Sequence, residues 1–405
     1  MRTMSSRKKG ISLIVLVITI IVIIILAVAV ILSIANNNPI ENANQAKMAN
    51  NEKTLEETAN LVYSDWYTKK KLDSNFSQKP GEYVEEALKK QGFELEDISR
   101  VAATDDGVSL VTIPKGFKHV SVLDSEGNET STGSKGYVIE DITDTDTKGN
   151  QFVWVPVNDI NNFVREEGYR DGNLEEKLTK TSEPYFEACD AEKNEYNEMK
   201  ESVSKYHGFY IGRYETSLDT NKKARSIAGV EPYHGNEYKW SNSKNMQVLS
   251  GGVREKASQV YSVEKSSIGS AVSTLVYGVQ WDQTVRWLSK NYPDIEKNST
   301  NYGNYKNANF MYIGTNSEET EKLEGSSVII PTGSTEHSKT NNIYDMCGNI
   351  DEWTMEAREF STGGRSIRGG NFIDNGGSFP VSFRNAMVPS TANNPEGFRI
   401  ALYIK

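Results

Sequence analysis

The feature that most constrains this chain is an unbroken run of 25 uncharged, mostly apolar residues from Ile11 to Ala35. As a helix this run would be about 37 Å long, enough to cross the hydrocarbon core of a bilayer. The ten residues before it contain four basic residues and no acidic one. The positive-inside rule therefore predicts a single-pass membrane protein with a cytoplasmic N-terminus and an extracellular C-terminal head.

The apolar run differs from a cleaved secretory signal. Such signals have an apolar core of about 7–15 residues and a small-residue cleavage site. Here the core is longer, and the residues after it are Asn36, Asn37, Asn38 and Pro39. The sequence therefore predicts that the helix is retained.

The start of the chain resembles type IV prepilins and pseudopilins. A basic leader ends in Lys8-Lys9-Gly10 and is followed by the apolar segment Ile11-Ser12-Leu13-Ile14-Val15. The resemblance implies cleavage after Gly10, a mature chain that begins at Ile11, and pilus or pseudopilus subunits as partners. The family usually has Glu at the fifth position after the cut, where this chain has Val15. A minor or capping pilus subunit and a plain membrane anchor therefore remain alternatives.

Charge excludes one class of partner. The chain has 45 basic and 55 acidic residues and a net charge of −10. Without the four basic leader residues, it has 41 basic and 55 acidic residues. Such an acidic head argues against nucleic acid or anionic lipid as ligand. Two cysteines, Cys189 and Cys347, are too few for a disulfide scaffold.

Patterning divides the chain into five segments: a leader (1–10), a transmembrane helix (11–35), a helical stalk (36–72), a short helix with a linker (73–109) and a head (110–405). The stalk is predicted from Leu55, Ala59, Val62 and Trp66, which recur at helical spacing. The short helix starts near Pro80 and stops at Gly92.

Within the head, runs of strand-forming residues predict strands at 109–114, 152–157 and 208–215. The segment from Tyr277 to Leu288 changes to helical period, with Trp281, Val285 and Leu288 on one face. Residues 289–340 are polar and predict long surface loops.

Three C-terminal motifs are specific in combination: Tyr344-Asp345-Met346-Cys347-Gly348-Asn349-Ile350-Asp351-Glu352-Trp353-Thr354, then Ile367-Arg368-Gly369-Gly370-Asn371-Phe372, then Gly397-Phe398-Arg399-Ile400-Ala401-Leu402. In this order they resemble the formylglycine-generating enzyme (sulfatase-modifying factor) family. The resemblance extends more loosely over residues 110–403. It implies an α+β fold in which the transmembrane and stalk helix precedes an irregular, loop-rich C-type-lectin-like domain.

The resemblance also implies a structural calcium ion at the first motif. Its ligands would be the side chains of Asp345 and Glu352 and the backbone carbonyls of Gly348 and Ile350, and oxygen donors of this kind suit Ca²⁺. Alternatively, Glu352 pairs with an arginine such as Arg399 or Arg368 and the calcium site is empty. The pair Gly348-Asn349 predicts a backbone turn with positive φ.

The oxidase chemistry of the family requires two cysteines shortly after the Arg-Gly-Gly motif, since paired thiolates capture copper. Aligned through Arg368, those positions are Asp374 and Phe379. The sequence therefore predicts neither copper binding nor formylglycine formation.

What remains is a binding function. In domains of this fold the polar surface between the last two motifs often contacts a ligand, and here it combines small polar residues with aromatic ones. The candidate ligand-binding residues are Asn371, Phe372, Asp374, Asn375, Ser378, Phe379, Phe383, Asn385 and Asn393. The leading hypothesis is a cell-surface protein whose non-catalytic head binds an extracellular glycan or protein. The alternatives are a minor pilus subunit and an enzyme with altered chemistry.

Overall fold

The structure, a computed structural model, describes residues 39–143, 145–166, 168–169, 193–235, 241–242, 247–248, 252–262, 268–357, 365–387 and 395–405. The chain divides into two compact units, residues 1–57 and 58–405. The first is described from Pro39 onward, where it consists of the first part of helix α2 (Pro39–Leu72).

Helix α2 confirms the predicted helical segment after Pro39. Proline stands at its first position, where the missing N–H costs no hydrogen bond. The predicted apolar stripe of Leu55, Ala59, Val62 and Trp66 is buried. Three lysines occupy the last turn, where cations interact favourably with the helix dipole.

The predicted membrane anchor requires correction. Among the described residues, no helix is both long and apolar enough to span a bilayer. The longest described helix, α2, has 34 residues but contains Asn, Glu and Lys throughout its length. The predicted segment Ile11–Ala35, with the processing site Gly10–Ile11, lies outside the described residues. The described helices therefore do not supply the single-pass anchor that the predicted fold class and the predicted localisation contain.

A small helical and β-hairpin module follows α2. Helix α3 (Pro80–Lys90) buries Val84 and Leu88 and ends before Gly92, whose φ of 85° confirms the predicted glycine stop. Helix α4 (Leu95–Ser99) leads into the antiparallel pair β1 (Val101–Thr104) and β2 (Gly107–Leu110). The strand predicted to reach Pro114 thus ends at Leu110.

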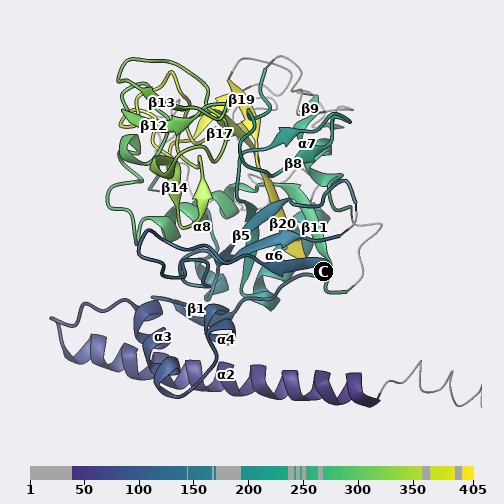
Figure 1. Ribbon diagram of the computed structural model, residues 1–405, viewed down its shortest axis with the longest axis vertical. Helices are drawn as coiled ribbons and strands as arrows, with labels where there is room; N and C mark the ends of the chain where they lie inside the picture. The colour runs from purple at the N-terminus through teal and green to yellow at the C-terminus, as the bar shows by residue number, and fades with distance from the viewer. Residues whose placement is uncertain are drawn as a thin grey trace, which may run out of the picture. The chain divides into compact units, whose positions relative to one another are not determined.

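The core of the head is a six-stranded antiparallel sheet in the order β11-β20-β6-β5-β4-β3 (Figure 1). Its strands are β3 (Phe117–His119), β4 (Val138–Asp141), β5 (Gln151–Pro156), β6 (Gly208–Gly212), β11 (Ala271–Leu275) and β20 (Ile400–Ile404). Strands β5 and β6 confirm two of the predicted strands. The C-terminal strand β20 lies inside the sheet, paired with β11 on one side and β6 on the other.

Helices cover this sheet. Helix α6 (Lys193–Tyr206) packs on β6 and β20, and Ser202 Oγ donates a 2.7 Å hydrogen bond to the carbonyl of Ile404. Helix α7 (Val253–Ser258) packs on β11, and α8 (Gly278–Leu288) packs on β5. Trp281, Val285 and Leu288 are fully buried on α8, as their spacing predicted.

A second, four-stranded sheet has the order β18-β17-β16-β19. It is formed by β16 (Asp351–Ala357), β17 (Arg365–Arg368), β18 (Asn385–Met387) and β19 (Glu396–Phe398). The pair β16–β19 is parallel and the others are antiparallel. All three C-terminal motifs therefore meet at this sheet and its junction with β20.

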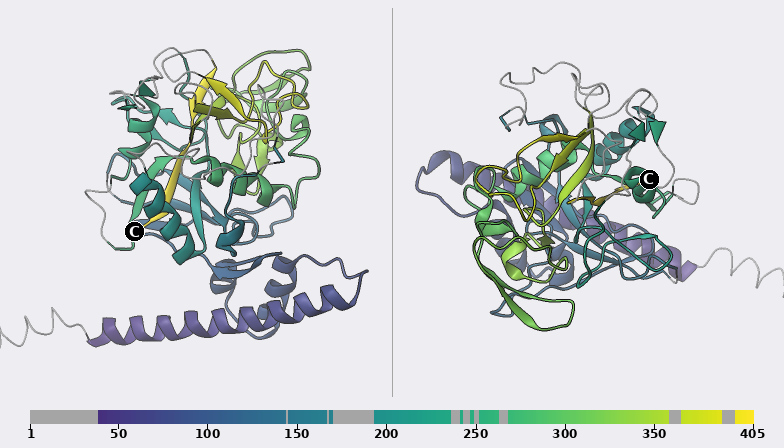
Figure 2. Two further views of the ribbon diagram at one scale, coloured as in Figure 1. Left: turned by 180° about the vertical axis from the view of Figure 1, so that it is seen from behind. Right: turned by 90° about the horizontal axis from the view of Figure 1, so that it is seen from above.

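The region 289–340, predicted as loops, also contains an antiparallel hairpin of β12 (Phe310–Ile313) and β13 (Glu319–Lys322). This hairpin and helix α7 lie on opposite sides of the head in both side views (Figure 2). The remaining short elements are β7 (Ser217–Leu218), β8 (Ala224–Arg225), β9 (Ser241–Asn242), β10 (Gln247–Val248), β14 (Lys339–Thr340), β15 (Ile343–Tyr344) and the 3₁₀ turns η1 (Ile160–Asn162), η3 (Thr300–Tyr302) and η4 (Glu336–Ser338).

Candidate functional site

The first motif forms a tight turn between β15 and β16. Gly348 and Asn349 have φ angles of 72° and 61°, which confirms the predicted left-handed turn. A side chain at Gly348 would place its Cβ 2.5 Å from the carbonyl oxygen of Asn304, so the backbone approach itself requires glycine. The amide group of Asn349 is buried in the turn and donates to Glu215 Oε2 at 2.5 Å.

At the base of the turn, Glu352 is paired with Arg399, and both side chains are buried. Nη2 of the arginine lies 2.6 Å from Oε1, and Nε lies 3.0 and 3.1 Å from the two carboxylate oxygens. The remaining guanidinium donors bind the backbone carbonyls of Gly212, Tyr344 and Asp345. This is the alternative that the sequence left open for Glu352.

Two further carboxylates are buried beside this ion pair. Asp345 Oδ2 accepts hydrogen bonds from Thr332 Oγ1 and the Gly333 N–H, both at 2.8 Å. Burial raises the pKa of Asp345. Burial, together with the charges of Asp345 and Glu352, raises the pKa of Glu215 well above its usual range. Glu215 was not predicted as a site residue, because it lies 134 positions before Asn349 in the chain.

The predicted calcium ligands do not fit a calcium ion while Arg399 occupies Glu352. Both oxygens of Glu352 are bound to the guanidinium, and of the Asp345 carboxylate only Oδ1 lacks a donor of good geometry among the described residues. Calcium requires six to eight oxygen ligands. Across the described ranges, no three His, Cys, Asp or Glu side chains lie together in a way that could hold a metal ion. Gly348 and Ile350 lie in the same turn, and the Ile350 N–H donates to Glu215 Oε1 at 3.2 Å.

The candidate ligand-binding residues divide by exposure. Asn375 and Ser378 are exposed, and Phe372, Asp374, Phe379 and Asn385 are half-buried. Asn371 and Phe383 are buried, and Asn393 lies outside the described residues. The Asn371 amide donates to Asp351 Oδ2 at 2.7 Å and therefore holds the segment in place from below.

Sequence reasoning missed a buried charge network that supports this segment. Its acids are Asp282 on α8 and Glu356 on β16, and they bind three arginines. Arg368 lies 2.9 Å from Asp282 and 3.3 Å from Glu356, and Arg384 contacts both acids. Arg165 lies 2.6 Å from Glu356. Burial alone would raise the pKa of Glu356, but the three guanidinium groups lower it to about 2. The network fixes the sheet β16–β18 against α8.

These motifs and their shared core can be compared with known proteins. Residues 278–404 match the sulfatase-modifying factor enzyme 1-like domain (FGE-sulfatase). The match runs from the start of α8 to the end of β20 and so contains both the Arg399 pair and most of the charge network. It does not include the prepilin-like N-terminus, which stays a prediction.

Two solved structures show distant similarity, each with 12% sequence identity. One, titled "Crystal Structure of CarF", has a TM-score of 0.28 and covers 49% of this chain and 87% of its own. The other, "Treponema denticola variable protein 1", has a TM-score of 0.26 and covers 73% of this chain and 93% of its own. No curated protein matched the chain.

In the sulfatase-modifying-factor-like domain, the two positions aligned with catalytic cysteines have other structural roles. Asp374 accepts the Asn371 N–H through its side chain and the Lys306 N–H through its carbonyl, at 3.2 and 2.9 Å. Phe379 packs edge-on against Phe383, with ring centroids 5.0 Å apart. Cys347 is fully buried, and burial raises its thiol pKa to about 12. Cys189 lies outside the described residues.

Proposed function

We propose that the sulfatase-modifying-factor-like domain is a non-catalytic ligand-binding domain. The observation that supports this most directly is the carboxylate of Asp374 and the ring of Phe379 at the positions where the oxidase chemistry requires thiols. Copper capture by the resembled enzymes depends on thiolates, which are soft ligands. Cys347 is buried and protonated at neutral pH, so it does not substitute for them.

The proposed binding surface is the segment Asn371–Phe379. Its exposed side chains are those of Ile373, Asn375 and Ser378, and the backbone of Gly377 is exposed beside them. Hydrogen bonds hold the segment from several sides: Asn371 to Asp351, and the Gly376 N–H to Asn307 Oδ1 at 3.1 Å. A surface loop held in this way loses little conformational entropy when it binds a ligand, which favours affinity.

The ligand class we propose is a glycan or a protein surface. Asn375 presents an amide that both donates and accepts hydrogen bonds, and Ile373 adds an exposed apolar contact beside it. The half-buried ring of Phe372 borders the same segment. The acidic chain disfavours a nucleic-acid ligand.

Two experiments test the proposal on the full chain. Incubation with copper and a sulfatase-type cysteine peptide should give no formylglycine product by mass spectrometry. A glycan array should give a defined ligand whose binding falls at least about tenfold in the double variant I373S/N375A. The control variant E321Q, on the exposed side of the β12–β13 hairpin, should bind as the wild type does. Formylglycine formation would overturn the proposal, as would ligand binding that is insensitive to I373S/N375A.

A further inference from the structure

A cavity of about 870 Å³ lies within the unit Thr58–Lys405 and shares no residue with the segment Asn371–Phe379. Its walls come from α3 and the residues before it, the β1–β2 turn, the C-terminal end of α8 and the β14–β15 turn. Cavities of this size accommodate small organic ligands and short peptides. No motif in the sequence indicated it, because its walls come from segments more than 200 residues apart.

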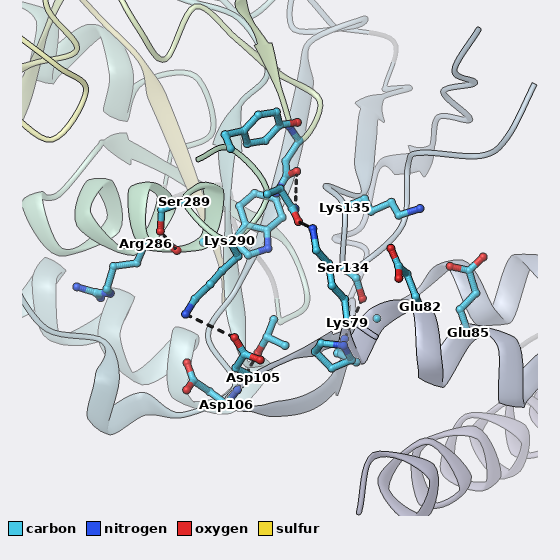
Figure 3. Close-up of a pocket in the computed structure, with 18 of the residues that line it drawn as sticks. Lys79, Glu82, Glu85, Asp105, Asp106, Ser134, Lys135, Arg286, Ser289 and Lys290 are labelled. Atoms are coloured by element: carbon cyan, nitrogen blue, oxygen red, sulfur yellow. Dashed lines mark hydrogen bonds and ion pairs between the residues drawn. The ribbon is translucent and has the colours of Figure 1, made fainter. Parts of the chain in front are cut away.

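A line of hydrogen bonds crosses this cavity (Figure 3). Lys79 Nζ donates to Asn291 Oδ1 at 2.7 Å, and Asn291 Nδ2 donates to Asn341 Oδ1 at 3.0 Å. On the neighbouring wall, Lys290 lies 3.5 Å from Asp105. These contacts connect the module α3–β2 to the head and hold the walls of the cavity at a fixed separation.

One residue of the cavity wall, Asn341, has a buried amide nitrogen without an acceptor in the described part of the chain. Asn341 and Asn342 form the two-residue turn between β14 and β15, with φ angles of 43° and 64°, as a type I′ hairpin turn requires. Asn341 is 94% buried, and its Nδ2 has no hydrogen-bond acceptor among the described residues. A buried donor without an acceptor is costly, so a rotation of this side chain toward a ligand oxygen in the cavity would be stabilising.

The rim carries charges of both signs, and several of these side chains form no ion pair among the described residues. The Lys79 ammonium is bonded to the neutral amide of Asn291. Within the described residues, the side chains of Lys135, Glu82 and Asp106 make no hydrogen bond or ion pair, and all three are exposed at the rim. Figure 3 shows Lys135 and Glu82 on one side of Lys79 and Asp105 and Asp106 on the other.

The charges at the rim indicate which class of ligand fits the cavity. A polyanion or a polycation would be repelled by half of the rim. A neutral sugar would strip water from the charged groups without compensating their charges, which is unfavourable. A ligand with one carboxylate and one ammonium group avoids the repulsion and compensates the desolvation of the rim charges.

We propose that this cavity binds a short peptide with free, charged ends. Its carboxylate lies toward Lys79 and Lys135, its ammonium toward Asp105 and Asp106, and a backbone carbonyl accepts the Nδ2 hydrogen of Asn341. The site is separate from the surface proposed above, so either can exist without the other.

The test uses the full chain and two sets of twenty Gly-Xaa-Gly tripeptides, one with free ends and one acetylated and amidated. Isothermal titration calorimetry should detect at least one free-ended peptide that binds in the millimolar range or tighter, with its capped form at least about tenfold weaker. If no free-ended peptide binds, or if capped peptides or a neutral trisaccharide bind equally well, the proposal is overturned.

Variants assign the binding to this cavity. The double variant K79M/K135M should weaken the peptide at least about tenfold, and D105N/D106N should do the same. K297M, which removes an exposed lysine that does not line the cavity, is the matched control and should change nothing. All variants should keep the wild-type circular dichroism spectrum. Unchanged peptide affinity in K79M/K135M would place the binding elsewhere and contradict the proposal.

Discussion

The guanidinium of Arg399 binds both carboxylate oxygens of Glu352 in the interior of the head, although the two residues lie 47 positions apart in the sequence. The pair joins strand β16 of the small sheet to the junction between β19 and β20, where the chain passes from the small sheet to the large one. It therefore connects the two sheets at the point where all three C-terminal motifs meet.

Removal of the arginine alone should be severely destabilising. In R399M the carboxylate of Glu352 would remain buried beside Asp345 without its counter-charge, which costs about 3–5 kcal/mol. Urea denaturation at neutral pH measures this loss. The double variant R399M/E352M should recover part of it, because no unpaired charge is left behind. If R399M and R399M/E352M lose the same unfolding free energy, the unpaired charge of Glu352 is not the cause of the loss.

The same pair predicts how the protein responds to calcium. Since both oxygens of Glu352 are occupied, the thermal midpoint should be the same in excess EDTA and in excess calcium chloride. Differential scanning calorimetry gives the comparison directly. A midpoint that rises clearly with calcium would show that the ion binds the native state and that Arg399 does not exclude it.

The charge network predicts that the unfolding free energy depends on pH. The three arginines lower the pKa of Glu356 to about 2. The ionised carboxylate therefore contributes fully to the unfolding free energy above the ordinary carboxylate pKa of about 4.5, and this contribution is lost as the pH falls toward 2. At neutral pH this contribution is about 3 kcal/mol. The difference in unfolding free energy between wild type and E356Q should therefore shrink by about 2 kcal/mol between pH 7 and pH 3. A difference that stays constant over this range would contradict the assignment.

Lys322 provides a different test, because its ammonium is buried without a carboxylate. Nζ donates to the carbonyls of Tyr305 and Ala308 at 2.6 and 2.8 Å and lies 5.6 Å from the ring centroid of Phe310. In K322M the carbonyl of Ala308 loses the Lys322 donor and that of Tyr305 keeps only the Ala308 N–H, so the unfolding free energy should fall by about 1–3 kcal/mol. E321Q, at the exposed neighbouring position, should leave stability within about 0.5 kcal/mol. An equal effect of the two substitutions would argue against the carbonyl contacts.

Much of the fold follows from local sequence signals. The apolar spacing of Trp281, Val285 and Leu288 predicted α8, and Gly348-Asn349 predicted a turn with positive φ. Where the burial pattern is weak, prediction failed: in the β12–β13 hairpin, Glu319 and Glu321 are exposed and the strands lack a clear apolar alternation.

The candidate sites were harder to predict, because they depend on contacts between distant segments. Glu352 was identified from its motif, but its partner was settled only when the fold brought Arg399 to it. Asp282 and Arg384 are 102 residues apart, and no local signal links them. The cavity next to Asn341 similarly combines the start of the described chain with its last third.

Strand β20 has a consequence for biosynthesis. Its neighbours β6 and β11 are made long before it, and until residue 404 has left the ribosome each presents an open edge to the other and to the solvent. The large sheet can therefore close only after residues 400–404 have been made. A chain that stops before Ile400 would leave the edges of β6 and β11 exposed and should be cleared by proteases or aggregate.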